Sequence, residues 1–249
     1  MLDVPFLREV AHRTGRPIFA TISGAHLYGF ASADSDVDLR GAFVLPKRSV
    51  LGLFPANETV TLTDQSRCDL DWVAHDIRKF ARMMTQHNGY VMEQLYSPIV
   101  VVDSPAFVEL KELGRGCITR PTVNHYLGFA RGRRKRLLEP DPTVKHLLYA
   151  YRVLMSGIHL MRTGEVVSHL GTLNALFRMS HVEELVARKR SGAEELAVFD
   201  TELTAHQTQL DRLEQALTAA HDSSSLPLVP STVDALEDFV IRVRLESPA

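Results

Sequence analysis

Residues 22–29 read Ile-Ser-Gly-Ala-His-Leu-Tyr-Gly, and residues 35–41 read Ser-Asp-Val-Asp-Leu-Arg-Gly. Together they join a turn of small residues to two aspartates, Asp36 and Asp38, in a segment with the pattern of a strand. Because strand side chains alternate between faces, both carboxylates point to the same side and can share a divalent cation. Carboxylate oxygens suit Mg²⁺. Gly24 in the turn lets backbone N–H groups approach a phosphate closely. The two segments therefore predict a site for a metal ion and a phosphate.

Five segments carry a family resemblance, namely residues 23–30, 34–41, 71–80, 93–98 and 145–150. A glycine turn followed by Asp-x-Asp resembles the nucleotidyltransferase superfamily of the DNA polymerase beta type. Within it, these segments are similar to the predicted nucleotidyltransferases associated with RNA-repair and phage genes. The first motif alone also fits an ordinary surface turn, because Gly, Ser and Asp are common turn formers. The later segments favour the family.

The order of elements predicts an α+β chain whose strands precede a helical region. The resemblance implies a nucleotidyltransferase fold, a small mixed sheet flanked by helices, over residues 1–116, and a helical domain over residues 117–249. Strands are expected at residues 18–23, 37–45, 59–63, 68–74 and 99–102. Helices are expected at residues 3–15, from 75 onward, and at 90–95, 105–114, 121–138, 143–163, 169–189, 193–221 and 230–245.

A third acidic residue is expected in residues 69–73, where Asp69 and Asp71 lie on one strand face. The resemblance aligns Asp71 with the superfamily's third carboxylate, which helps to hold the catalytic metal and acts as the base toward the attacking hydroxyl. Asp69 remains the alternative, and either residue also fits a charge that protects a sheet edge from aggregation. Asp36, Asp38 and Asp71 are thus the expected catalytic residues and Mg²⁺ ligands.

The turn itself is expected to bind the nucleotide through Ser23, Gly24, Ala25 and His26. Superfamily members usually have serine after the motif glycine, where its hydroxyl binds a nucleotide phosphate, whereas this chain has Ala25. A backbone amide remains available, and Ser23 stands one residue before the glycine. This departure also fits a second hypothesis, a catalytically weak binding module or antitoxin-like partner of another protein.

Cations for the triphosphate are expected from further along the chain. Lys145 and Arg152 stand seven residues apart on one expected helix, so they share a face, with Tyr149 between them. The resemblance implies that such helices contribute phosphate contacts in this superfamily. Arg40 follows Asp38 on the same strand face, and Lys79 lies near the start of the helix after the third carboxylate.

A run of five cations within six residues comprises Arg131, Arg133, Arg134, Lys135 and Arg136. The formal net charge of the chain is only −2, so this local run is more informative than the total. Charge runs are typical of a solvated helix face, and they also fit the binding of a polyanion. We expect these residues to bind the acceptor, with an RNA end favoured.

Bulk composition fits an ordinary soluble protein. The chain has 249 residues, of which 45% are hydrophobic and 23% charged. It lacks a membrane-spanning apolar run, and its first residues lack a leader pattern, which predicts a cytoplasmic protein with no membrane partner. Cys68 and Cys117 have neither zinc nor redox spacing.

The leading functional hypothesis is transfer of a nucleoside monophosphate from an NTP to a hydroxyl, with two Mg²⁺ ions and release of pyrophosphate. The acceptor remains open among an RNA 3′ end, a small molecule and a protein side chain. Sequence reasoning also leaves the nucleobase and the oligomeric state open.

Overall fold

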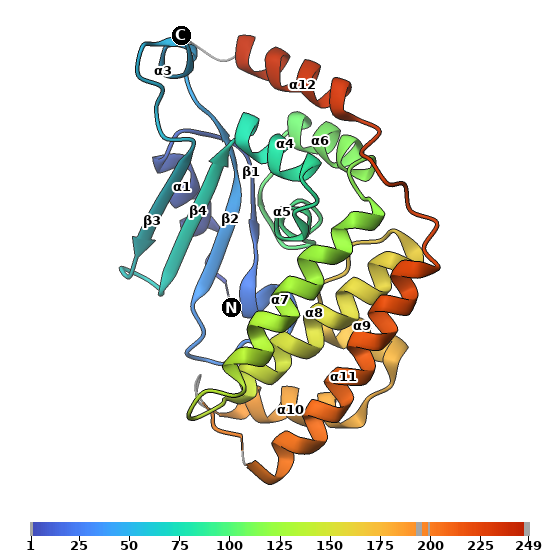
Figure 1. The fold of residues 1–249 in the computed structure, drawn as a ribbon. Helices are drawn as coiled ribbons and strands as arrows, with labels where there is room; N and C mark the ends of the chain where they lie inside the picture. The colour runs from blue at the N-terminus through green and yellow to red at the C-terminus, as the bar shows by residue number, and fades with distance from the viewer. Residues whose placement is uncertain (1, 193–195, 199, 247–249) are drawn as a thin grey trace. The chain divides into compact units, whose positions relative to one another are not determined.

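The computed structural model describes residues 2–192, 196–198 and 200–246. Its elements follow the chain from blue to red in Figure 1. The strands are β1 (Arg16–Ile22), β2 (Val37–Val44), β3 (Thr59–Asp64), β4 (Leu70–Asp76) and β5 (Val100–Val102). The helices are α1 (Val4–Arg13), α2 (Gly24–Tyr28), α3 (Lys47–Leu51), α4 (Ile77–Thr85), α5 (Gly89–Leu95), α6 (Pro105–Arg115), the 3₁₀ turn η1 (Arg120–Thr122), α7 (Val123–Arg136), α8 (Val144–Thr163), α9 (Leu170–Phe177), α10 (Ser180–Ser191), α11 (Asp200–Asp222) and α12 (Val233–Leu245).

The five strands form one mixed sheet in the order β3-β4-β2-β1-β5. β2 and β4 run parallel, and the other neighbouring pairs run antiparallel. The connection from β2 to β4 passes through α3 and β3, so the two central strands can run in the same direction. The predicted α+β class, with an N-terminal mixed sheet and a helical C-terminal region, is confirmed.

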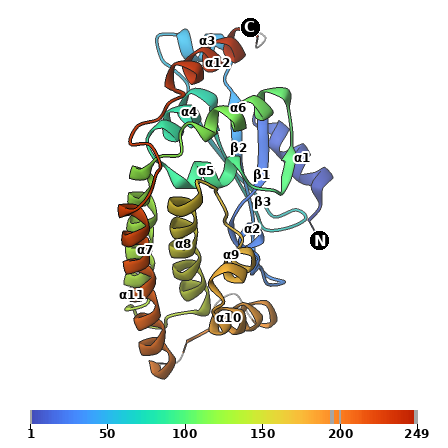
Figure 2. The same ribbon diagram turned by 90° about the vertical axis from the view of Figure 1, so that its right-hand side faces the viewer.

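The two faces of the sheet have different partners. Alternate residues of β2 and β4, such as Leu39 and Trp72, belong to a buried apolar cluster that includes Phe6 and Val10 of α1. The intervening residues point to the opposite face, where α4 and α5 lie (Figure 2). Strand alternation therefore places Asp38, Arg40 and Asp71 on the face away from α1.

Polar caps start several of the helices around the sheet. The side chains of Asp76, Asn88 and Ser104 accept backbone hydrogen bonds at the first turns of α4, α5 and α6. Such caps satisfy N–H groups that have no partner within the helix. They fix where each helix begins and hence which of its residues face the sheet.

Contacts divide the chain into two compact units that are not continuous in sequence. The first unit contains residues 1–24, 36–119 and 229–249, and so includes the sheet and α12. The second contains residues 25–35 and 120–228. We expected continuous domains divided after residue 116. The structure instead groups the C-terminal helix with the sheet, and most of the glycine turn with the helical unit.

Helix α8 is the centre of the second unit. It packs against α7 and α11 along its length, and against α9 and α10 (Figure 1). Most of its 20 residues are buried. A Thr143–His146 capping box starts α8, and Gly164 in the left-handed conformation ends it.

Four local features differ from the predictions or extend beyond the described residues. The expected glycine turn forms the short helix α2, and α3 was not anticipated. The single helix expected at residues 169–189 is interrupted at Arg178, whose φ of 55° ends α9 before α10 begins. The helix expected at 193–221 falls partly outside the described residues and is α11 from Asp200 onward.

Among the described residues, no helix combines the length and the apolar character needed to cross a bilayer. Cys68 and Cys117 are both free thiols, and Cys117 is buried. Burial raises the pKa of the Cys117 thiol, although a hydrogen bond with Thr232 opposes the shift.

Candidate active site

Two predicted acidic residues meet on adjacent strands. Asp38 on β2 stands directly opposite Asp71 on β4 in the parallel register. Because residues paired in this way share a face of the sheet, the two carboxylates lie side by side. Both side chains are partly accessible, at 20% for Asp38 and 40% for Asp71. The structure thus forms an acidic pair at the start of both strands.

The guanidinium of Arg40 holds this acidic pair together. Its Nη2 donates to Asp38 Oδ1 at 2.5 Å and to Asp71 Oδ2 at 2.8 Å. Its Nη1 donates to the carbonyl oxygens of Leu39 and Asp71, and its Nε donates to the Tyr90 hydroxyl at 2.7 Å. A guanidinium has five N–H donors. These five bonds use all of them, so we interpret Arg40 as a positioning residue rather than as the predicted nucleotide ligand.

The charges around Arg40 favour its protonated form. Burial by itself lowers the pKa of Arg40, because a buried cation loses its hydration. Tyr90, Asp38 and Asp71 outweigh this effect, and the pKa of Arg40 is raised. The site therefore contains a permanent cation bound to two carboxylates.

Ser23 and Gly24 lie beside Asp38 at the end of β1. The Ser23 N–H donates to the Asp38 carbonyl at 2.8 Å. Gly24 has a φ of +60°, and a Cβ there would stand 1.7 Å from Asp38 Oδ2. Only glycine fits this place without displacing the carboxylate. The Ser23 hydroxyl is buried and has no hydrogen-bond partner among the residues that the structure describes.

Asp36, the remaining predicted metal ligand, is not part of this cluster. Asp36 is exposed and lies just before β2, while Asp69, the alternative to Asp71, is exposed just before β4. Over residues 2–192, 196–198 and 200–246, no three His, Cys, Asp or Glu side chains gather as a metal-binding group. The acidic site consists of the Asp38–Asp71 pair with Arg40.

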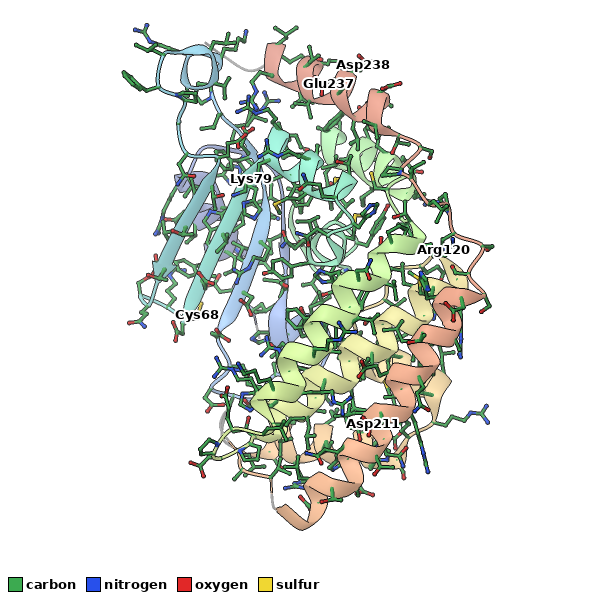
Figure 3. The ribbon with its side chains drawn as sticks, in the orientation of Figure 1. Cys68, Lys79, Arg120, Asp211, Glu237 and Asp238 are labelled. Atoms are coloured by element: carbon green, nitrogen blue, oxygen red, sulfur yellow. The ribbon has the colours of Figure 1, made fainter. Side chains whose placement is uncertain are left out.

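Lys79 lies away from the acidic pair. It belongs to the first turn of α4, after the far end of β4, and its Nζ donates to the Thr59 hydroxyl at 2.5 Å. Figure 3 shows Lys79 and Cys68 at opposite ends of the sheet, and Asp71 follows Cys68 by three residues. The structure therefore does not bring Lys79 to the acidic pair.

In the second unit, predicted nucleotide ligands from α8 join aromatic side chains. The Arg152 guanidinium lies 4.0 Å from the centre of the Tyr28 ring, and the Tyr28 and Tyr149 rings meet edge to face at 5.5 Å. Arg133 of α7 lies 4.7 Å from the Tyr149 ring. Tyr149, Arg152 and Arg133 thus form a cationic and aromatic cluster.

The other predicted nucleotide ligands of this unit occupy helix starts. Lys145 is half-buried in the first turn of α8. Ala25 is buried and His26 is half-buried, and both belong to α2, which begins at Gly24. These positions remain predictions as nucleotide contacts.

The basic run of α7 divides between two faces of the helix. Arg134 forms ion pairs with Asp211 and Glu214 of α11, and Arg131 lies 3.9 Å from Glu214. Figure 3 labels Asp211 on α11. These two arginines therefore have partners within their own unit, whereas Arg133 packs against aromatic rings.

The Arg136 side chain forms an exposed ion pair with Glu139, three residues further along the chain. Lys135 is exposed. The five cations thus differ in how far each is already neutralised, although the sequence presents them as one run.

Two residues at these sites were missed by sequence reasoning. Tyr90 of α5 accepts a hydrogen bond from Arg40, fifty residues away, and nothing in the local pattern indicates this contact. Phe129 of α7 lies beneath Arg133, with the guanidinium 4.8 Å from its ring. Its spacing of four residues from Arg133, one helical turn, was the available signal.

Comparison with known families gives a match over most of the chain. A model of the RlaP family, described as "RNA repair pathway DNA polymerase beta family", matches residues 6–242. The match includes both strands that carry Asp38 and Asp71. It also continues through the helical region to α12.

Individual relatives come from an archaeon, a bacterium and a phage. The uncharacterized protein MJ0002 of Methanocaldococcus jannaschii is 31% identical over 165 residues, covering 64% of this chain and 66% of that protein. The uncharacterized protein YcgL of Bacillus subtilis is 26% identical over 211 residues, or 80% of each chain. An uncharacterized 38.9 kDa protein of Enterobacteria phage T4, from the nrdC-mobD intergenic region, is 24% identical over 43% of this chain and 34% of its own length.

Proposed function

Because the chain belongs to the RlaP family, the RNA repair pathway DNA polymerase beta family, we propose that it transfers a nucleoside monophosphate from an NTP to a hydroxyl. The acceptor that we favour is the 3′ end of an RNA, and the second product is pyrophosphate. The observation that supports this proposal best is the Asp38–Asp71 pair beside Gly24.

The acidic pair suits a magnesium-dependent phosphoryl transfer. Carboxylate oxygens are the hard ligands that Mg²⁺ prefers. Gly24 leaves the space beside the Asp38 carboxylate clear, and the buried Ser23 hydroxyl offers an additional polar group. These residues fit a divalent cation and a phosphate. Asp36 is proposed as the third ligand, which requires its segment before β2 to move.

When bound, Mg²⁺ ions would neutralise the charge of the triphosphate and favour deprotonation of the acceptor hydroxyl. Asp38 and Asp71 would hold them, while Arg40 keeps the two carboxylates oriented. Asp71 is proposed as the base that receives the hydroxyl proton. Most of the rate then depends on positioning and charge, because phosphoryl transfer needs little covalent work from the protein.

Other residues are proposed to hold the nucleotide. Ser23 and the N–H groups that begin α2 would bind phosphate oxygens, since N–H groups in such turns form anion sites. Lys145 and Arg152 would contribute positive charge, and Tyr149 an aromatic face. Arg133 would contact the acceptor.

Incubation with each labelled NTP, Mg²⁺ and an RNA bearing a free 3′ hydroxyl tests this function. We expect label to enter the RNA with release of pyrophosphate. Asp38→Asn and Asp71→Asn should each lower the rate by at least about 100-fold, because each removes a charge from the reacting site. The exposed Asp238 of α12, labelled in Figure 3, provides the matched control. Asp238→Asn makes the same chemical change and should leave the rate intact.

Three outcomes would contradict the proposal in different ways. Loss of activity in Asp69→Asn, with activity retained in Asp71→Asn, would assign the role proposed for Asp71 to the alternative residue. Unchanged turnover in Asp38→Asn would refute the acidic site. Absence of turnover with every NTP and acceptor, together with a protein that copurifies in fixed ratio, would favour the binding module.

A further inference from the structure

One face of α7 is hollowed into an open groove with a volume of about 540 Å³. Its lining includes His125, Gly128, Phe129, Gly132, Arg133 and Arg136, and none of the described lining residues is acidic. These residues recur at intervals of three and four, so they form one stripe along the helix. We call this feature the α7 groove.

Two glycines leave the helix backbone bare along the α7 groove. A Cβ added at Gly128 or at Gly132 would meet no atom within 4 Å. Glycine is therefore not required at either place by internal packing. Both residues cost helix stability relative to alanine. What they provide is a flat surface one turn long, open to a ligand.

Aromatic rings lie along the same stripe. His125 and Phe129 are stacked with ring centres 6.0 Å apart and an angle of 24° between their planes. Both residues are half-buried. A planar ligand can stack against such rings, and nucleobases do so whatever their identity.

Arg133 gives the groove a cation that no carboxylate neutralises within the described part of the chain. Its guanidinium lies between the Phe129 and Tyr149 rings, 4.8 Å and 4.7 Å from their centres. Among the described residues it forms no ion pair, in contrast to Arg134 of the same helix. Its half-buried position disfavours a bare positive charge, so binding of an anion would relieve this cost. Arg136 lies one turn further, and its exposed pair with Glu139 is weak enough to exchange.

We propose that the α7 groove binds a segment of single-stranded RNA, with a base on the His125 ring, which Phe129 supports from behind, and a phosphodiester on Arg133. The inference rests on the proposed function, since it identifies how the acceptor is held. Single strands fit better than duplexes because their bases are free to stack on side chains. A groove of two arginines, aromatic rings and bare backbone matches alternating bases and phosphates.

Binding of a labelled single-stranded RNA, measured by fluorescence anisotropy without NTP or Mg²⁺, tests this inference. The full-length Asp38→Asn protein is the background, so that chemistry does not affect the readout. Phe129→Leu and Arg133→Gln should each weaken binding about 10-fold. Arg133→Gln should also reduce the salt dependence by about one phosphate contact. Arg212→Gln, the same charge change on exposed α11, is the control and should leave affinity within about two-fold.

Gly132→Leu separates groove binding from loss of fold. Leucine favours the helix more than glycine, and the added side chain enters open space, so the melting temperature should not fall. RNA affinity should nevertheless fall about 10-fold or more, because the side chain fills the stacking surface.

Four results would overturn the inference. They are unchanged affinity in Phe129→Leu, a loss in Arg131→Gln equal to that in Arg133→Gln, equally tight binding of a duplex, and full competition by an acidic phosphopeptide. The first two would indicate diffuse charge attraction, and the last two another ligand. RNA binding without nucleotidyl transfer would refute the proposed function alone. Transfer to RNA at the wild-type rate in every groove variant would refute the groove proposal alone.

Discussion

A single guanidinium, that of Arg40, allows two carboxylates to stand together on neighbouring strands. Asp38 and Asp71 would repel each other across the parallel ladder without a cation. Arg40 is only 7% exposed, so its charge is screened little by water. Its bond to Tyr90 ties this arrangement to α5. The fold thus holds both proposed metal ligands in place.

Replacing Arg40 should therefore cost much more than replacing an exposed arginine. In Arg40→Gln, the acidic pair loses its buried counter-charge, and we expect the free energy of unfolding to fall by about 2–4 kcal/mol. Urea denaturation measures this change. Arg78→Gln, which breaks an exposed pair with Glu58, is the matched control and should cost at most about 1 kcal/mol. Equal costs in the two variants would show that Arg40 does not stabilise the site.

The predictability of the acidic site differs among its residues. Alternation along a strand and the family motif were enough to indicate Asp38 and Asp71. They did not reveal that Arg40 donates all its hydrogen bonds to groups within the protein. The bond to Tyr90 forms only because α5 packs over the sheet, which the local sequence does not indicate. Asp36 lies before the strand begins, where alternation no longer determines the direction of a side chain.

At the scale of elements, the length of β4 separates two predicted roles. Asp71 stands near the start of β4, and Lys79 follows its end. A strand advances about 3.3 Å per residue, so the five steps from Asp71 to Asp76 span roughly 16 Å. The strand expected at 68–74 already contained this constraint. Lys79 follows the end of that strand, so it lies at the opposite end of β4 from Asp71.

Helix interruptions were harder to predict than helices. The apolar period continues through residues 169–189, but Arg178 adopts a left-handed conformation that periodicity does not indicate. In contrast, the helix expected at 143–163 ends as predicted, and Gly164 in the left-handed conformation follows it directly. Sequence patterns therefore predict the ends of helices best where a capping residue or a glycine marks the boundary.

The edge formed by β3, β4 and α4 should respond to acid through His75. Burial lowers the pKa of His75 to about 4, and the charges of Lys79 and Arg40 add to the shift. Its Nδ1 lies 3.0 Å from the Thr59 hydroxyl, which accepts a hydrogen bond from Lys79. The neutral ring can accept from that hydroxyl, whereas the protonated ring cannot.

The sign of the pH effect follows from these pKa values. An unfolded histidine titrates near 6.5, so between about pH 6.5 and pH 4 the unfolded chain binds more protons at this position. Stability from neutral His75 is therefore complete above pH 6.5 and lost as the pH falls toward 4. Melting temperatures of the wild type and of His75→Gln, recorded between pH 6.5 and pH 4, measure this loss of stability. We expect a smaller decline in the variant, and parallel curves would contradict a buried neutral histidine.

For the whole molecule, the C-terminal helix belongs with the sheet although most of the helical unit intervenes in sequence. Arg244 of α12 donates to Asp76 Oδ1 and to the Leu45 carbonyl, both at 2.7 Å. Asp76 is completely buried and caps α4. Sequence reasoning placed α12 in the helical domain, because periodicity identifies a helix but not the distant surface on which it packs.

Removal of the Arg244 charge should show how much the sheet unit depends on α12 for its stability. In Arg244→Met, the buried Asp76 carboxylate loses its cation, and we expect the free energy of unfolding to fall by about 3–5 kcal/mol. Arg242→Gln, on the same helix, breaks exposed pairs with Glu109 and Glu246 and should cost at most about 1 kcal/mol. Urea denaturation compares the two variants.

Adding Asp76→Asn to Arg244→Met should recover part of the loss, because the neutral amide no longer leaves a buried charge unpaired. Equal costs for the two arginines, or no recovery in the double variant, would contradict the assignment of α12 to the stability of the sheet unit.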